Sequence, residues 1–169
     1  MKLQLRSANL VAPIVFGATR VGLGVLWLHE GLFKYGAHFG RADILLVADS
    51  ARSNSRVPGY FTELAEFALR GCPGLFGFVI PLLETCLGVA LILGVLTLPA
   101  AMVSSLTLMS YWSSDQLIAQ YPIMGALSVV VIAWPVLAAR LSTTSLILAA
   151  FKRRRHARFL IGGPLRRWL

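Results

Sequence analysis

Cysteine and histidine are scarce in this chain, which limits the chemistry that it could carry. Of 169 residues, two are cysteines and three are histidines. Cys72 and Cys86 form neither a CxxC pair nor a metal-ligand pattern, and Cys86 is expected too deep along a helix to meet Cys72. We therefore expect no metal site, no disulfide and no redox dithiol, and both cysteines should serve as packing residues.

The sequence motifs of complete enzymes are also missing. The chain has no set of four histidines for haem, no glycine-rich phosphate loop and no nucleophile elbow. It contains no internal repeat and no low-complexity segment. These absences leave no sign of a complete enzyme in this chain alone, and no catalytic residue is assigned.

Acidic residues are absent from the C-terminal region. Eight of the 16 basic residues lie at or after Arg140, and no acidic residue does. In a soluble protein such a tail would suggest nucleic acid, but beside membrane helices it indicates a cytoplasmic flank facing anionic lipid. Lys2 and Arg6 make the N-terminus basic as well. Both termini are therefore expected in the cytoplasm, which requires an even number of membrane spans.

Apolar residues are what the chain has in excess. They make up 57% of the sequence, against about 45–50% in a soluble domain, and the mean hydropathy is +0.73. They gather in four runs, so we predict an all-α, four-helix transmembrane bundle within residues 1–151, followed by a basic cytoplasmic tail, residues 152–169. The first run is too long for a cleavable signal peptide, and Pro135 predicts a kink in the last. The predicted spans are about residues 10–33, 75–96, 99–118 and 123–139.

The connection between the first two spans, residues 34–73, is long. Its five basic and four acidic residues nearly balance, which suits an external loop. Pro58 to Gly71 has the pattern of a short amphipathic helix. Its apolar face holds Tyr60, Phe61, Leu64, Phe67 and Ala68. This helix either lies on the outer membrane surface or packs on the mouth of the bundle, and both can be true.

Two ionisable residues lie well inside predicted spans, Arg20 in the first and Glu84 in the second. At 1.5 Å per residue, Arg20 lies about 14 Å and Glu84 about 18 Å from the inner edge of the membrane. We therefore predict that the two residues form a buried ion pair. One interpretation is a structural clamp that fixes the register of the helices, and the other is a polar site for a head group or a proton.

Small residues accompany both charges. In the first span, steps of four and three place on one helix face the residues Arg20, Gly24, Trp27, Gly31 and Lys34. In the second span the same spacing groups Gly77, Pro81, Glu84 and Gly88. Small residues on a helix face predict close approach of another helix.

A second group of polar and aromatic residues is expected at the outer ends of the first and third spans. Its members are His29, Glu30, Lys34, Tyr111, Trp112 and Asp115. One interpretation is a belt of residues that anchors the helices at the membrane interface. The other is a ligand site, in which aromatic rings stack a quinone and His29 or Glu30 exchanges its protons, or a site for an outer partner.

The motifs around these charges resemble those of the DoxX/DoxD family of membrane proteins. Arg20-Val-Gly-Leu-Gly-Val-Leu-Trp, with Gly31 and Lys34, is similar to the first helix of that family. Glu84-Thr-Cys-Leu-Gly, continued to Leu96-Thr97, is similar to the second. The resemblance covers about Arg20 to Pro135, and the long outer loop is closer to the DoxD side. The basic tail and the lack of a fused DoxA-type domain depart from the family pattern.

This resemblance implies a four-helix bundle with both termini inside, acting as the membrane subunit of a redox complex of the thiosulfate:quinone oxidoreductase type. Arg20, Lys34 and Glu84 are the residues carried over. The implied cofactor is a non-covalently held quinone, and the implied setting is a bacterial or archaeal plasma membrane. The expected partners are the lipid membrane and other subunits or further copies of the chain, not nucleic acid.

Two other functions stay open. The chain could be a non-enzymatic scaffold or accessory subunit of a larger membrane assembly. It could also be a small transporter subunit, although four spans with one buried ion pair offer little hydrated path in a monomer.

Overall fold

The structure is a computed structural model that describes residues 2–116 and 118–146, with side chains from residue 10 onward. The predicted basic tail and the side chains of Lys2 and Arg6 lie outside the described residues. Within these ranges every regular element is helical, as the sequence predicts. The elements are α1 (Lys2–Gly36), α2 (Arg41–Ser53), α3 (Gly59–Leu64), the π-helix η1 (Ala65–Leu69), α4 (Pro73–Leu93), α5 (Thr97–Ser113), α6 (Tyr121–Ala133) and α7 (Pro135–Ala138).

Two of the described helices are long and apolar enough to cross a membrane: the Leu10–Gly36 part of α1, and α4. The other two predicted spans correspond to shorter helices. The third, α5, has 17 residues and ends at Ser113. The fourth is divided, because α6 stops at Ala133 and α7 starts at Pro135. A proline has no backbone N–H to continue the hydrogen-bond ladder, so the break lies where the sequence predicts a kink.

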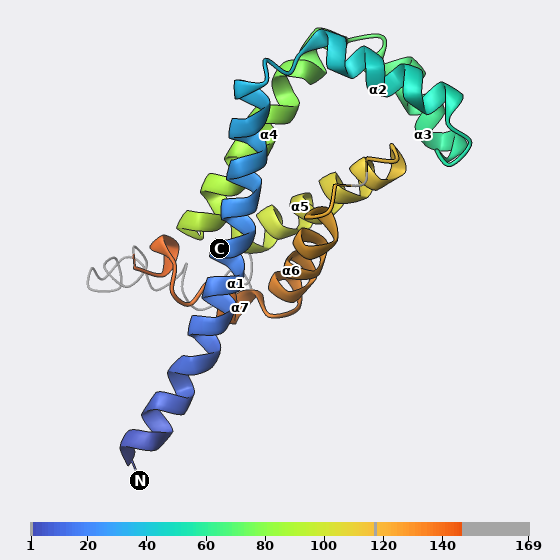
Figure 1. The fold of residues 1–169 in the computed structure, drawn as a ribbon. Coiled ribbons are helices and arrows are strands. Elements are labelled where there is room, and N and C mark those ends of the chain that lie inside the picture. Colours follow the sequence, from blue (N-terminus) through green and yellow to red (C-terminus); the bar gives the residue numbers. More distant parts are fainter. Residues whose placement is uncertain (1, 117, 147–169) are drawn as a thin grey trace, which may run out of the picture.

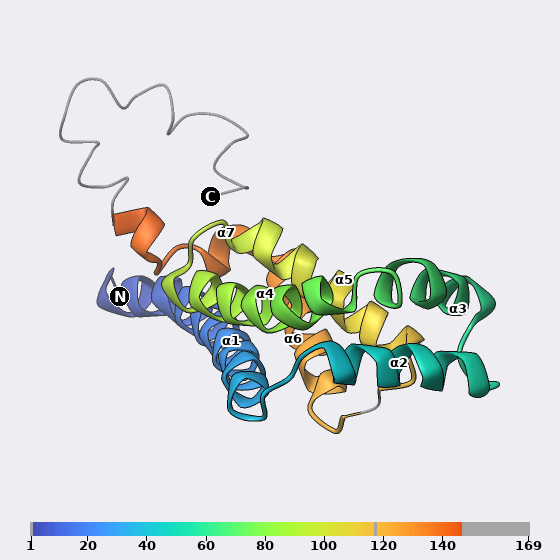
Figure 2. The ribbon, with the colours of Figure 1, turned by 90° about the horizontal axis from the view of Figure 1, so that it is seen from above.

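Helices α1 and α4 run antiparallel, side by side along most of α4 (Figures 1 and 2). Glycines set their separation. A Cβ added to Gly88 would lie 2.6 Å from the backbone N of Leu28, and one added to Gly24 would lie 2.8 Å from the backbone N of Ile92. Neither position has room for a side chain, so the prediction of close approach through small residues is confirmed.

A buried core joins this helix pair to α5 and α6. Leu23, Trp27 and Leu91 are fully buried within it. The indole N–H of Trp27 donates a hydrogen bond to Ser104 Oγ at 2.6 Å, and the Ser104 hydroxyl bonds that of Ser128 at 2.8 Å. These hydroxyls satisfy a buried indole donor and connect α1, α5 and α6 through their side chains.

The segment from α2 to η1, here called the arch, leaves one end of the α1–α4 pair. It extends over the side of the molecule where α5 and α6 lie (Figures 1 and 2). The start of the arch packs directly on α4. A Cβ added to Gly77 of α4 would lie only 2.6 Å from the carbonyl carbon of Gly40, the residue before α2. The predicted helix Pro58–Gly71 is present as α3 and η1, but the sequence pattern did not predict α2.

The arch has its own small core and an exposed apolar side. This core joins α2 to α3 and η1, and its buried residues are Ala48, Ala51, Val57, Phe61 and Ala65. Tyr60, Leu64 and Phe67 are exposed, Phe67 to 87%. The predicted apolar face is therefore divided, with Phe61 packed inward and Phe67 pointing outward.

Candidate functional site

Among the residues whose side chains the structure describes, the most buried ionisable group is the carboxyl of Glu84, whose residue is 0% exposed. Lys34 Nζ of α1 donates a hydrogen bond to Glu84 Oε1 at 2.6 Å. The hydroxyl of Tyr111, on α5, donates to the same oxygen at 2.5 Å. The other carboxyl oxygen, Oε2, is buried and has no hydrogen-bond partner. Three helices thus converge on one carboxyl group, and one of its oxygens is left bare.

Glu30 extends this group toward α6. Lys34 Nζ also lies 3.4 Å from Glu30 Oε2, one helical turn earlier. The Tyr121 hydroxyl donates to Glu30 Oε2 at 3.3 Å, and the side-chain amide of Gln120 donates to Glu30 Oε1. The rings of Tyr111 and Tyr121 stack with centroids 5.3 Å apart. We call Glu30, Lys34, Glu84, Tyr111 and Tyr121 the polar cluster.

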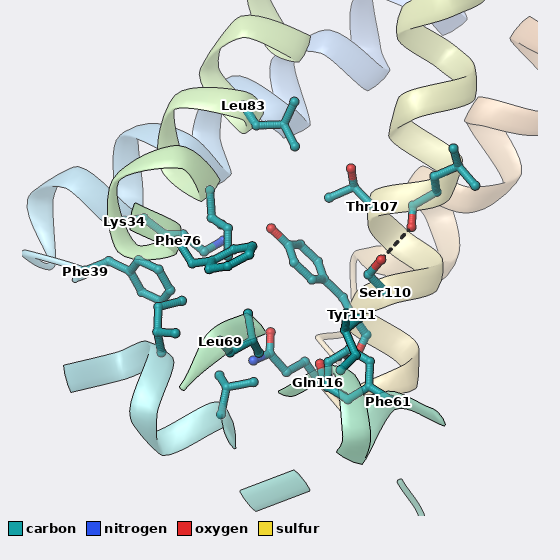
Figure 3. A pocket seen from close by; sticks show the side chains of 16 residues that line it. Lys34, Phe39, Phe61, Leu69, Phe76, Leu83, Thr107, Ser110, Tyr111 and Gln116 are labelled. Atoms are coloured by element: carbon teal, nitrogen blue, oxygen red, sulfur yellow. Dashed lines mark hydrogen bonds between the residues drawn. The ribbon is translucent and has the colours of Figure 1, made fainter. Parts of the chain in front are cut away.

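A cavity of about 290 Å³ lies beside the polar cluster, between the arch and helices α4 and α5 (Figure 3). Most of its wall is apolar. The lining residues are Lys34, Phe39, Ile44, Val47, Phe61, Leu64, Leu69, Phe76, Ile80, Leu83, Leu106, Thr107, Ser110, Tyr111, Ser114 and Gln116. Lys34 and Tyr111 belong to both the wall and the polar cluster. We call this cavity the arch pocket. Its apolar wall and its ionisable residues, Lys34 and Tyr111, suit an amphiphilic ligand.

Arg20 and Glu84 do not form the predicted ion pair, although both are buried. Arg20 donates to the carbonyl oxygens of Ala138 and Ile92 at 3.0 Å, of Leu141 at 3.1 Å, and of Leu91. The carbonyls of Leu91, Ile92 and Ala138 lie at the C-terminal ends of α4 and α7, where helices leave acceptors free, and that of Leu141 lies just after α7. Arg20 is thus bound by backbone carbonyls, as a structural clamp between helix ends.

The register of α1 against α4 explains why the predicted pair was wrong. Added Cβ atoms on Gly24 and Gly31 would meet Ile92 and Thr85, respectively. Antiparallel packing in this register places the level of Lys34, not that of Arg20, opposite Glu84. The two α1 side chains are 14 positions apart in sequence, which is about 21 Å along a helix.

The residues predicted to form an outer group lie in three environments: the polar cluster, the exposed surface and, for Asp115, a contact with the arch. Glu30, Lys34 and Tyr111 come together in the polar cluster. His29 is exposed and stacks on Phe33, with ring centroids 6.4 Å apart. Trp112 is 51% exposed, which agrees with a surface anchor. His29 and Trp112 therefore do not belong to the site, whereas Tyr121 and Gln120 do and were missed. Their position beside Pro122, at the turn before α6, was the available signal.

Asp115 fastens the arch to the end of α5. It accepts hydrogen bonds from Asn54 Nδ2 at 2.7 Å and Arg56 Nε at 3.1 Å, both from the loop after α2. We call Asn54, Arg56 and Asp115 the latch. The bonds from Arg56 and then Asn54 hold the pKa of the Asp115 carboxyl below its ordinary value. Asp115 has a φ of 59°, the left-handed conformation with which helices often end, and its N–H donates to the carbonyl oxygen of Trp112 at 3.0 Å.

Among the described residues, no group of three or more histidine, cysteine, aspartate or glutamate side chains could hold a metal ion. Cys72 and Cys86 are unpaired and exposed, so they are not core packing residues.

The fold and the site define a helical protein with two candidate membrane-crossing helices and an amphiphilic pocket under an arch. No protein-family model, curated protein or solved structure matches the chain. The resemblance to DoxX/DoxD proteins therefore remains a prediction from the sequence motifs.

Proposed function

We propose that the chain is a DoxX/DoxD-like membrane subunit of a redox complex and that it binds a quinone in the arch pocket. The observation that carries the proposal is the shared position of Lys34 and Tyr111, which line an apolar cavity and contact the buried Glu84. A quinone needs an apolar site for its ring and tail, and a donor for its carbonyl oxygen.

The unused bonding capacity at the pocket end suits such a ligand. A lysine ammonium has three donors, and two of those of Lys34 are directed to Glu30 and Glu84. The third is available for a carbonyl oxygen. Phe39 and Phe76 line the wall and could pack against a ring (Figure 3). Electrons would come from a partner subunit, as expected for one component of a complex.

The same proposal includes a membrane topology with four crossings. Helices α1 and α4 would cross fully, with the shorter α5 and the α6–α7 pair packed against them as the third and fourth crossings. Asp115 and the arch would then lie outside the hydrocarbon region, on the outer side, and both termini in the cytoplasm. Exposed apolar side chains along α1, α4 and α5 support a lipid-facing surface.

Calorimetric titration of the full chain in lipid nanodiscs with a short-chain ubiquinone analogue tests the proposal. Leu83→Trp would fill the pocket without removing a polar group, and we expect it to weaken binding at least tenfold, or about 1.4 kcal/mol. Leu82→Trp is the matched control, since the neighbouring Leu82 is exposed outside the lining. Absent binding by the unaltered chain, or equal weakening by both variants, would reject the pocket as a quinone site.

The scaffold function is the alternative that a specific observation supports. Tyr60, Leu64 and Phe67 form an exposed apolar stripe on the arch. Purification from the native membrane in mild detergent, followed by mass spectrometry, separates the two functions. A co-purifying redox enzyme or stoichiometric quinone supports the proposal, whereas a large assembly without redox components supports the scaffold.

A further inference from the structure

The polar cluster contains more acid than base. Two carboxyl groups, Glu30 and Glu84, share one cationic partner among the described residues, Lys34. If all three were ionised, the cluster would carry one net negative charge. Glu84 is fully buried, and the Glu30 side chain is 7% exposed. An unbalanced charge is strongly disfavoured where water cannot solvate it, so the cluster needs one more positive charge.

The neighbouring groups do not supply that charge. From α5 and α6 the cluster is faced by the phenols of Tyr111 and Tyr121, and from the loop before α6 by the amide of Gln120. All three are neutral donors. Arg20 is bound by carbonyls at the ends of α4 and α7, and Arg56 is bonded to Asp115. A proton is therefore the simplest way to balance the cluster.

Hydrogen-bond geometry indicates which carboxyl holds the proton. Glu30 accepts bonds from Gln120, Tyr121 and Lys34, and both of its oxygens are satisfied. Glu84 accepts both of its bonds on Oε1, whereas Oε2 is buried without a partner. Burying a charged carboxylate oxygen without a hydrogen-bond partner costs more free energy than burying the neutral hydroxyl of a carboxylic acid at the same position.

We infer that Glu30, Lys34 and Glu84 together hold one exchangeable proton at neutral pH, resident on Glu84 and exchanging with water through Glu30. Glu30 is the more exposed carboxyl, and Gln120 connects it to the loop at the arch end of the molecule.

Transfer of this proton to a bound ligand rests on the proposed function. Lys34 and Tyr111 line the pocket and contact Glu84. When a ligand oxygen becomes basic, one of them can transfer a proton to it, so its own N–H or O–H bond breaks and a ligand O–H bond forms. Glu84 then reprotonates that donor after its carboxyl group rotates and brings the O–H of Oε2 to the place of Oε1, which faces both donors. The cluster is left with one negative charge until Glu30 takes up a proton from water.

Infrared spectroscopy of the chain in nanodiscs tests the inference without any ligand. A protonated carboxyl has a C=O stretch distinct from that of a carboxylate, and deuterium oxide shifts it if the proton exchanges. At neutral pH we expect the intensity of one protonated carboxyl in the unaltered chain. Charge counting predicts loss of this band in Glu84→Gln and equally in Glu30→Gln, because one carboxylate then balances Lys34. It predicts doubled intensity in Lys34→Gln.

Glu63→Gln is the matched control, since Glu63 is an exposed acid of the arch and its loss should leave the band unchanged. A missing band in the unaltered chain would overturn the inference, and so would a band that survives in both Gln variants. If a Gln variant does not fold, the unaltered chain and Lys34→Gln still decide. A band without quinone binding would retain the proton site and reject the proposed function, whereas quinone binding without a band would do the reverse.

Discussion

Lys34 of α1, which lines the arch pocket, meets Glu84 of α4, with Lys34 Nζ 2.6 Å from Glu84 Oε1. Fifty positions separate them in the chain, so this contact exists only when α1 and α4 pack in one register. Tyr111 brings α5 to the same oxygen. The contact therefore joins three helices and places ionisable groups at the edge of an apolar cavity.

Glu84→Leu should destabilise the protein more than Glu84→Gln does. Leucine leaves the hydroxyl of Tyr111 and an N–H of Lys34 buried without an acceptor, at a cost of about 1–3 kcal/mol for each lost partner. Glutamine keeps a carbonyl oxygen that can accept both bonds. Denaturant unfolding in mixed micelles, followed by circular dichroism, measures the difference. Equal stability of the two variants would mean that these hydrogen bonds do not hold the helices together.

Arg20→Met should destabilise the bundle while leaving ligand binding in the folded fraction unchanged. The substitution removes the donor to four carbonyls, and each buried carbonyl that stays dry costs about 1–3 kcal/mol. Lys34, which lines the pocket, lies about 21 Å from Arg20 along α1. Arg41→Met is the control, because Arg41 is exposed and its loss should change the free energy of unfolding by under about 0.5 kcal/mol. A large loss of quinone affinity in folded Arg20→Met would contradict this structural role.

Local sequence patterns predicted the small-residue helix faces of this molecule, but they did not predict which polar side chains meet across different helices. The helix face with Gly24 and Gly31, and that with Gly88, could be found because helical spacing is a property of a few neighbouring residues. The partner of Glu84 could not, because it depends on the register between two helices. Tyr121 was missed for the same reason, since Glu30 lies 91 positions away.

The arch shows a second limit of prediction from sequence. Residues 58–71 have an apolar face, so a helix could be predicted there. The apolar run of Arg41–Ser53, residues 44–48, is too short to distinguish a helix from a strand by pattern alone. The helix buries Ile44, Ala48 and Ala51, and the two alanines pack with residues of α3 and η1. This helix depends on tertiary packing, which local pattern and propensity do not report.

Acidification should loosen the arch before it unfolds the bundle. The folded chain holds the pKa of Asp115 below its unfolded value, chiefly through the hydrogen bond from Arg56. The contribution of the latch is therefore complete above the unfolded pKa and is lost as the pH falls through the folded pKa. Hydrogen exchange of the arch amides, measured from neutral to acidic pH and divided by the intrinsic exchange rate at each pH, should rise in that window.

Asp115→Asn separates the latch from other acid effects. Its arch amides should exchange faster already at neutral pH and depend less on acidification, since the titrating group is gone. Glu63→Gln, an exposed acid of the same arch, should behave as the unaltered chain. Exchange in Asp115→Asn that matches the unaltered chain at every pH would show that the latch does not hold the arch.

Gly88→Val tests whether close packing of α1 on α4 sets the site. The first added carbon would lie 2.6 Å from the backbone N of Leu28, and backbone cannot move aside as a flexible side chain can. The helices must separate or slide, at a cost of about 1–3 kcal/mol in stability, and Lys34 then loses its register with Glu84. Gly22→Val is the matched control, because nothing lies within 4 Å of a Cβ at that position. We expect weaker quinone binding and lower stability in Gly88→Val than in Gly22→Val, measured by calorimetry and by denaturant unfolding. Lower stability with unchanged binding would mean that the pocket tolerates a shift of α1, and that the arch and α5 position its ligand instead.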